Sequence, residues 1–252
     1  MCELLGFSAA EKTDIREYLR SFYSHSDLHP HGWGMMYEDG LRCVVKESVK
    51  ANESILLPEI INNMPDQKCT LAHIRYATVG RIKEENCHPF TAEDNSGREW
   101  TMIHNGTIYS GGTTYRYYQK QQGDTDSERL FLAFIDNMND RLSHKDMNER
   151  ERFAAVSSFI AQHAPRNKLN LILYDGDLLY VHKNLKNTLS YKKTDRGIIF
   201  STHPLDNTGW APFPMAQTIA YNKGTEVYRG ERHKGVFVPS LEYITSLDAM
   251  NI

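Results

Sequence analysis

Short strand-like segments separated by tight turns fill the last third of the chain and constrain its fold most. Runs rich in branched and aromatic residues alternate with turn signals such as Asp175-Gly176 and Asn222-Lys223-Gly224. The spacing predicts strands at 168–174, 178–183, 189–193, 197–201, 217–222 and 226–229. Many short strands joined by close turns are typical of antiparallel sheets, because parallel strands need long crossover connections.

The first two thirds of the chain mix strand and helix patterns. Strands are predicted at 2–7 and 100–104, and a buried strand followed by a loop is predicted within 69–78. A hairpin of 35–37 with 42–46 turns at Asp39-Gly40. Apolar residues at helical spacing predict helices at 14–23, 54–64 and 149–163, and Thr125-Asp126-Ser127-Glu128 is a capping box before a further helix. Helices segregated from antiparallel sheets indicate an α+β architecture, and 252 residues without a linker favour one domain over 2–252.

Composition excludes several classes of protein. With 29 Lys and Arg against 32 Asp and Glu, the net charge of −3 argues against a nucleic-acid partner. Hydrophobic residues at 40% exclude a disordered chain, and no apolar run reaches the roughly 18 residues of a transmembrane helix. Glu3 stands where a secretory signal would carry a basic residue. We therefore expect a cytoplasmic protein with no membrane partner, and its oligomeric state stays open.

The cysteines and histidines do not predict a metal site. No Cys-x-x-Cys pair occurs, and a secretory context for disulfides is absent, so Cys43 and Cys69 are expected to be buried thiols. His25, His29 and His31 have no acidic partner at fixed spacing. We expect neither a metal nor a cofactor.

Cys2 differs from the other cysteines because of its position. Removal of Met1 before a small residue would leave a thiol and an α-amine on Cys2. Their ordinary pKa values, about 8.5 and about 7.7, are close enough for the amine to take the thiol proton, through a water. Cys2 is therefore a candidate nucleophile that needs no histidine, whereas the plain alternative is a buried thiol at the start of a strand.

Five segments in order carry a family resemblance. They are Met1-Cys2, His73-Ile74-Arg75-Tyr76-Ala77-Thr78, Asn86-Cys87-His88-Pro89-Phe90, His104-Asn105-Gly106 and Thr125-Asp126-Ser127-Glu128. Together they resemble the glutaminase domain of the class II glutamine amidotransferases, which are N-terminal nucleophile hydrolases. The opening Met-Cys-Glu-Leu-Leu-Gly is similar to the stand-alone YafJ-like branch. The resemblance covers at least Cys2 to Glu128 and implies a four-layer αββα sandwich of two antiparallel sheets.

The resemblance implies a catalytic role for three residues. Cys2 would attack a carboxamide carbon, and the Asn105 side-chain amide and the Gly106 backbone N–H would form the oxyanion hole. Asn-Gly is also a common turn dipeptide, so the same pair predicts a tight turn after the strand. The two interpretations are compatible, because such a turn could present the donors.

Four further residues match the family's substrate-binding segments. Arg75 would hold the α-carboxylate of the substrate, with Thr78 in the same loop, and Asp126 would hold the α-ammonium group. His88 would mainly support the site. From the residues alone, Arg75 could be a solvated cation and Asp126 a favourable charge in the first turn of a helix. Val79 and Tyr76 depart from the family's Arg-Trp-Ala-Thr-His-Gly, and Val79 removes a polar contact from the loop.

The resemblance leaves three functions open. The first is attack of Cys2 on the γ-carboxamide of L-glutamine, giving a γ-glutamyl thioester and then glutamate and ammonia. The second keeps this chemistry on a γ-glutamyl amide metabolite, as in a related branch of ergothioneine biosynthesis. The third is a non-catalytic binding or regulatory subunit that retains the fold. Because 252 residues leave no room for a synthase domain, an ammonia acceptor is expected on a separate subunit.

Overall fold

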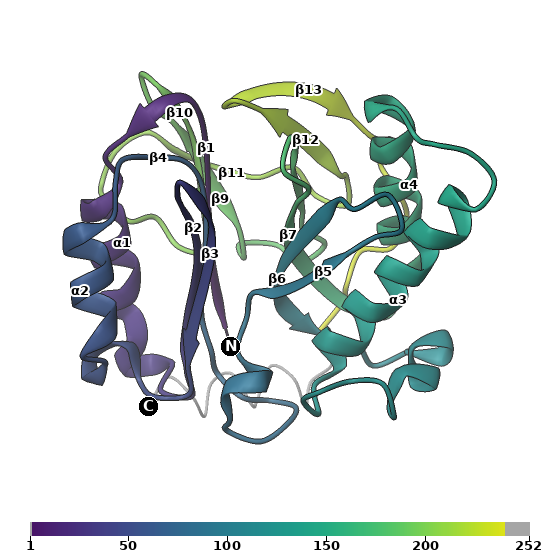
Figure 1. The fold of residues 1–252 in the computed structure, drawn as a ribbon, viewed down its shortest axis with the longest axis horizontal. Coiled ribbons are helices and arrows are strands. Elements are labelled where there is room, and N and C mark those ends of the chain that lie inside the picture. The colour runs from purple at the N-terminus through teal and green to yellow at the C-terminus, as the bar shows by residue number, and fades with distance from the viewer. Residues whose placement is uncertain (1, 240–252) are drawn as a thin grey trace.

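The computed structural model describes residues 2–239 and has four layers. Two helices cover the outer face of a seven-stranded sheet, and two others cover the outer face of a six-stranded sheet (Figure 1). The sheets pack against each other in the centre (Figure 1). This arrangement confirms the α+β class and the αββα sandwich that the family resemblance implies.

The seven-stranded sheet is antiparallel and has the order β11-β9-β10-β1-β4-β2-β3. Its central strand, β1, begins at the lower end of the sandwich (Figure 1). The bounds are β1 Glu3–Thr13, β2 Trp33–Asp39, β3 Leu41–Glu47, β4 Gln67–Ile74, β9 Ser190–Lys193, β10 Gly197–Ser201 and β11 Trp210–Pro212.

The six-stranded sheet is also antiparallel, with the order β13-β12-β8-β7-β6-β5. Its bounds are β5 Phe90–Glu93, β6 Glu99–Thr107, β7 Lys168–Tyr174, β8 Leu179–His182, β12 Ile219–Asn222 and β13 Thr225–Arg229. β5 pairs with β6 only as far as Met102, whereas β7 pairs with it through Thr107. The last residues of β6 therefore have a partner strand on one side only.

Local capping explains where one of the outer helices begins. The helices are α1 Arg16–Ser24, α2 Leu56–Asn63, α3 Asp126–Leu142 and α4 Glu149–His163, and short 3-10 turns lie at His25–Leu28, Ala51–Glu53, Glu84–Asn86 and Gly112–Tyr117. Thr125 caps α3 by accepting a hydrogen bond from the Glu128 backbone. The Glu128 carboxylate accepts from the backbone N–H groups of Gln122 and Gly123 instead of Thr125. The predicted reciprocal box is thus half wrong, because Glu128 holds the preceding turn.

Apolar side chains form one cluster at each interface between layers. Phe7, Leu19 and Phe22 belong to the cluster between the first sheet and its helices. A second cluster lies between the sheets, and a third lies under α3 and α4. Gly6 lets the sheets approach, because a Cβ there would lie 2.8 Å from Cδ1 of Ile172. The central packing thus holds β1 firmly against the second sheet.

Most predicted elements are confirmed, but the Asn105-Gly106 turn is wrong. Residues 168–174, 197–201 and 149–163 form the elements predicted for them, whereas β5 and β11 were not predicted. Asn105 and Gly106 lie inside β6 and pair with Asn170 and Leu169 of β7. Pairing with a long neighbouring strand overrides the local turn preference of Asn-Gly. Any donors that they present must come from a strand.

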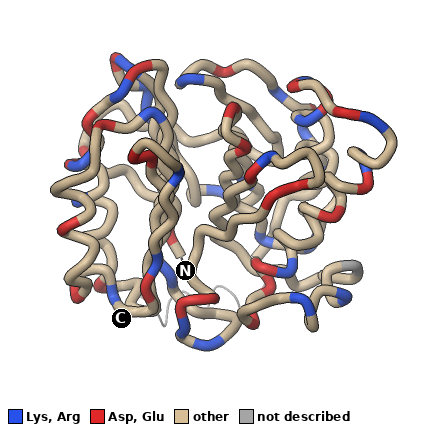
Figure 2. Tube along the Cα trace, viewed as in Figure 1, with Lys and Arg blue, Asp and Glu red and all other residues tan. Residues whose placement is uncertain are grey.

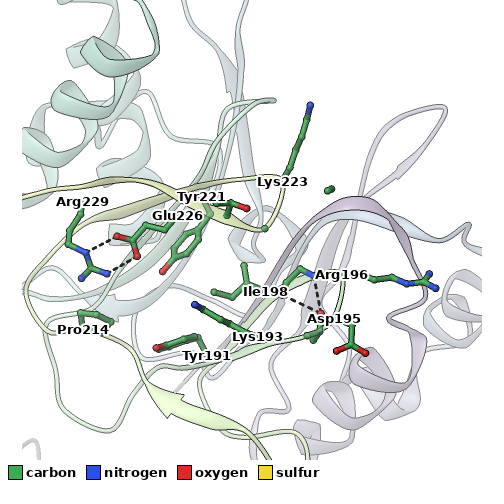
Figure 3. Close-up of a pocket in the computed structure, with 15 residues that line it drawn as sticks. Tyr191, Lys193, Asp195, Arg196, Ile198, Pro214, Tyr221, Lys223, Glu226 and Arg229 are labelled. Atoms are coloured by element: carbon green, nitrogen blue, oxygen red, sulfur yellow. Dashed lines mark hydrogen bonds and ion pairs between the residues drawn. The ribbon is translucent and has the colours of Figure 1, made fainter.

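A cavity of about 610 Å³ lies at the end of the sandwich opposite the start of β1. It is lined by Ala10 of β1, the turn after β9 and the β12–β13 hairpin. The Lys193 side chain points toward Tyr191 and Tyr221, while Arg196 and Lys223 point away (Figure 3). Ala10 lies eight residues after Cys2. Because a strand rises about 3.3 Å per residue, the cavity lies far from the candidate nucleophile.

Charges of both signs are interspersed over the described part of the chain (Figure 2). Lys and Arg alternate with Asp and Glu on the outer helices and on the hairpins of both sheets (Figure 2). Within residues 2–239, no helix is long and apolar enough to cross a bilayer.

Candidate active site

Cys2 lies beside the end of β4 because of the strand register. Glu3 pairs with Ile74, so the residue before β1 meets the residues that follow β4. The Cys2 Sγ lies 3.3 Å from the backbone nitrogen of Tyr76 and 3.4 Å from its carbonyl oxygen. Burial raises the pKa of the Cys2 thiol, while the Tyr76 backbone, Lys168 and Arg75 act in the opposite direction. The thiol is therefore neutral as it stands and needs a base for attack.

Arg75 organises the loop that follows β4. Its side chain is buried, and Nη1 donates to the carbonyl oxygen of Arg81 at 3.0 Å, while Nη2 donates to that of Val79 at 3.1 Å. Longer contacts reach the carbonyls of Gly80 and His31. Both ends of the guanidinium thus hold the loop of residues 76–81. A carboxylate ligand would have to replace some of these carbonyls.

Asn105 and Gly106 lie near the end of β6, where the strand is paired with β7 alone. The Asn105 side chain is 1% exposed, and its Nδ2 has no hydrogen-bond partner among the described residues. A buried donor without a partner lowers the stability of the folded state by about 1–3 kcal/mol, and this donor is free to bind a ligand oxygen. At Gly106 a Cβ would lie 2.0 Å from the Lys168 carbonyl oxygen, so only glycine fits.

Lys168, the first residue of β7, contacts Asn105 directly. Its Nζ donates to the Asn105 Oδ1 at 2.8 Å. The side chain is 2% exposed, and burial lowers the pKa of Lys168 to about 8 while the charge of Cys2 acts to raise it. Lysine is almost never this buried unless it is paired. The ammonium group therefore binds the Asn105 amide, and its charge acts on Cys2.

His104 ties the end of β6 to β7 and α3. Its Nε2 lies 3.2 Å from the Lys168 carbonyl oxygen, and its Nδ1 lies 2.9 Å from the Ser127 Oγ. Because a carbonyl can only accept, Nε2 carries the hydrogen and Nδ1 accepts from the serine. Burial lowers the pKa of His104 to about 4, so the ring is neutral near pH 7. Its two hydrogen bonds hold the ring in place beside the Asn105-Gly106 backbone.

Asp126 joins the first turn of α3 to the segment after Gly106. Its Oδ2 accepts from the Ile108 backbone at 2.7 Å, and its Oδ1 accepts from the Ser127 backbone at 3.0 Å. The side chain is buried, and the positive end of the helix dipole favours a carboxylate there. Asp126 therefore fixes the chain leaving β6 and still carries acceptor capacity for a cationic ligand.

Thr78 and His88 occupy different environments. Thr78 is exposed in the loop held by Arg75. His88 is buried against His73, with ring centroids 4.1 Å apart, and neither of its ring nitrogens has a partner among the described residues. Burial lowers the pKa of His88 well below its usual value. The contacts of His88 are thus with the protein interior.

Glu3 gathers three histidines next to Cys2. Its buried carboxylate lies 2.9 Å from Nδ1 of His25, and His29 and His203 lie within 4.0 Å. His31 instead accepts from the Ala77 backbone through Nδ1 at 2.9 Å and supports the loop after Arg75. No group of three His, Cys, Asp or Glu residues in the described chain is arranged to hold a metal ion.

A comparison with protein families matches the model of "Glutamine amidotransferases class-II" over residues 1–194. The chain belongs to this family. Residues 1–194 include both sheets' central strands, Cys2, Arg75, Asn105 and Lys168. The match therefore covers the candidate nucleophile and the residues proposed around it, but not His203.

The chain is also similar to several curated relatives and solved structures. An uncharacterized protein of Methanocaldococcus jannaschii is 28% identical over 92% of this chain and 72% of its own. YafJ of Escherichia coli, named as a candidate glutamine amidotransferase, is 29% identical over 70% of each chain. A glutamine amidotransferase structure from Pseudomonas aeruginosa, so named from prediction, has a TM-score of 0.65 at 20% identity over 90% of this chain and 100% of its own. The glutamine phosphoribosylpyrophosphate amidotransferase of Bacillus subtilis has a TM-score of 0.65 at 13% identity over 93% of this chain and 50% of its own, which shows the shared fold.

Sequence reasoning missed two residues of this family member's site. Lys168 was considered only as the start of a strand, and Glu3 only as evidence against a secretory signal. The available signal was the pattern of 168–174, where Lys168 and Asn170 are the polar residues of an otherwise apolar strand. A buried strand seldom carries a lysine without a partner.

Proposed function

We propose that the chain hydrolyses the γ-carboxamide of L-glutamine to glutamate and ammonia, with Cys2 as the nucleophile. The observation that carries this proposal is the buried Asn105 amide, whose Nδ2 has no protein partner among the described residues. The Asn105 Oδ1 accepts from Lys168, and the charge of Lys168 also acts on Cys2. Membership of the class-II glutamine amidotransferases supports glutamine as the substrate.

The α-amine of Cys2, released by removal of Met1, is the proposed base. Burial raises the pKa of the Cys2 thiol, so the sulfur must lose its proton as it attacks. An amine with an ordinary pKa of about 7.7 can accept this proton at neutral pH. No histidine is needed, and His104 is excluded as the base because both of its ring nitrogens are engaged.

The reaction proceeds through two tetrahedral intermediates. Sγ bonds to the amide carbon, and the carbonyl oxygen takes the negative charge beside the Asn105 Nδ2 and the Gly106 N–H. The C–N bond then breaks, the amine returns its proton to the leaving nitrogen, and ammonia departs. Water attacks the resulting thioester with the amine again as base, and glutamate leaves as the Cys2 thiol is restored.

Arg75 and Asp126 are proposed to recognise the two charged groups of the amino acid. The Arg75 guanidinium would exchange loop carbonyls, such as that of Val79, for the α-carboxylate. Asp126 would accept from the α-ammonium group while it keeps its bond to Ile108. Substrate binding would therefore rearrange the loop that carries Thr78, and Val79 would make apolar contacts where the larger family members have histidine.

The decisive experiment compares Cys2→Ala with Cys43→Ala. Glutamate release from L-glutamine is measured for both variants and for the wild-type chain, after intact-mass measurement shows whether Met1 is absent. We expect activity only in processed protein, full activity for Cys43→Ala and none for Cys2→Ala. Full activity in Cys2→Ala, or in chains that retain Met1, would overturn the mechanism.

The same assay addresses the substrate and the fate of ammonia. Several γ-glutamyl amides are tested beside L-glutamine, and the ratio of their kcat/KM values identifies the preferred leaving group. A separate acceptor subunit is proposed to use the ammonia, and adding cell extract should then raise glutamine turnover. A preference for a γ-glutamyl amide above glutamine would shift the proposal to the hydrolase of such a metabolite.

A further inference from the structure

Lys168 is a buried cation at the centre of the candidate site that the proposed reaction does not use. It is the first residue of β7 and pairs with Thr107, the residue that follows Asn105 and Gly106 on β6. Its Nζ donates to the Asn105 Oδ1 at 2.8 Å, and the side chain is 2% exposed. Its charge also acts on Cys2, where it favours the thiolate.

The hydrogen bond decides which way the Asn105 amide faces. A lysine ammonium has three donors and no acceptor, so the Asn105 atom that meets it must be the oxygen. The Nδ2 group is then directed to the other side, where it has no partner within residues 2–239. An asparagine amide can otherwise rotate by half a turn at little cost and present its oxygen to an oxyanion.

We propose that Lys168 is a positioning residue, which orients the Asn105 amide for the oxyanion hole and stabilises negative charge on Cys2. The proposal rests on the proposed glutaminase chemistry for its first part. Its second part concerns only Cys2 and holds for any reaction of that thiol. Lys168 thus adds a fixed positive charge beside the neutral donors of Asn105 and Gly106.

Other ionisable groups also surround this cluster. Arg75 at the end of β4 acts on Cys2, while His104 on β6 and Asp126 on α3 act on each other beside Lys168. His104 is neutral near pH 7 because burial lowers its pKa to about 4. Changes in reactivity above neutral pH therefore belong to Cys2, its amine and Lys168, whose pKa burial lowers to about 8.

Lys183 provides a matched control for the burial of a lysine. It is 1% exposed, burial lowers its pKa to about 8, and its Nζ donates to the Leu189 carbonyl oxygen at 2.8 Å. The two lysines thus share burial and an oxygen partner. They differ in that the Lys168 Nζ donates to Asn105 whereas the Lys183 Nζ donates to a backbone carbonyl. In addition, Lys168 but not Lys183 is among the main charges that act on Cys2.

The experiment compares Lys168→Met with Lys183→Met, each with a measured Tm. We expect Lys168→Met to lower kcat for glutamine hydrolysis about 100- to 1,000-fold, as for loss of an oxyanion donor, with little change in KM. Lys183→Met should keep kcat within a few-fold of wild type. If Lys168→Met does not fold, Lys168→Gln serves as the same test with a polar side chain.

A double-variant cycle separates positioning from general damage. If Lys168 acts through Asn105, adding Lys168→Met to Asn105→Ala should lower kcat by far less than Lys168→Met does alone. If the kcat losses of the two single variants multiply in the double variant, the positioning role is overturned. Wild-type kcat in Lys168→Met, or an equal loss in Lys183→Met, would overturn it as well.

Alkylation of Cys2 by iodoacetamide tests the second part without any substrate. The rate is followed against pH by mass analysis of the N-terminal peptide. We expect the Lys168→Met profile to move to higher pH and the Lys183→Met profile to match wild type. An unmoved Lys168→Met profile would overturn the charge effect. If the Lys168→Met profile moves as expected but the wild-type chain hydrolyses no amide, only the proposed function is contradicted.

Discussion

The Sγ of Cys2 lies 3.3 Å from the backbone nitrogen of Tyr76, the residue that follows Arg75. This contact joins the start of the chain to the loop that Arg75 holds. It results from the pairing of Glu3 with Ile74, which brings residues 2 and 75–76 to the same end of the first sheet. Cys2 and the loop that Arg75 holds are therefore joined by a direct contact, and a change in either should affect the other.

Asn105→Asp should abolish most activity without unfolding the protein. An aspartate keeps an oxygen for Lys168 and forms an ion pair with it, but it loses the N–H donors and adds negative charge at the oxyanion hole. We expect kcat to fall by at least about 100- to 1,000-fold, with a Tm near that of wild type. Retention of a tenth or more of wild-type kcat would contradict the oxyanion role of Asn105.

Arg75→Lys should weaken glutamine binding and loosen the loop of residues 76–81. A lysine keeps the charge but cannot replace a guanidinium that holds carbonyls at both ends. Loss of a charge-assisted pair of hydrogen bonds predicts a KM about 10- to 100-fold higher. Steady-state kinetics and amide hydrogen exchange of the loop are the measurements. Arg81→Lys, in the same loop but exposed, is the control and should leave KM unchanged.

Asp126→Asn should weaken binding of substrates that carry an α-ammonium group. The amide oxygen can still accept from the Ile108 backbone, so the segment after Gly106 should keep its position. We expect KM for L-glutamine to rise about 10- to 100-fold, because a hydrogen bond between two charged groups is lost. KM for glutaramate, which lacks the α-amine, should change little. An equal rise for both substrates would argue against contact with the ammonium group.

Protonation of His25 should stabilise the protein through Glu3. The hydrogen bond to Glu3 raises the pKa of His25 above its ordinary value of 6.5. A raised pKa in the folded state adds stability that is complete below the unfolded value and is lost as pH rises through the folded value. Wild-type Tm should therefore fall more between pH 6 and pH 8, about the range of histidine titration, than that of Glu3→Gln.

Two measurements check this pH dependence. The His25 pKa is followed by NMR and should decrease in Glu3→Gln. The exposed variant Glu17→Gln, which alters only an ion pair on α1, should keep the wild-type pH dependence of Tm. An identical decrease of Tm with pH in wild type and Glu3→Gln would show that the His25–Glu3 contact does not contribute.

Local patterns predicted the architecture well where they agreed with the tertiary structure. The branched and aromatic run at 168–174 and the helical spacing of apolar residues at 149–163 act within a few residues, so the sequence contains their causes. The Asn105-Gly106 turn was wrong because hydrogen bonds to β7, more than sixty residues away, extended β6 through it. The capping role of Glu128 failed similarly, since a nearby turn offered two backbone donors.

The candidate site shows the same division. The sequence by itself determined that a cysteine follows Met1 and that an arginine, an Asn-Gly pair and an acidic helix start follow in the family's order. Only the tertiary structure decided that Arg75 binds its own loop, that Lys168 orients Asn105, and that Glu3 gathers histidines beside Cys2. These contacts join residues that strand pairing and sheet packing bring together. Burial then shifts the pKa values of Cys2 and Lys168, because desolvation depends on neighbours in space rather than along the chain.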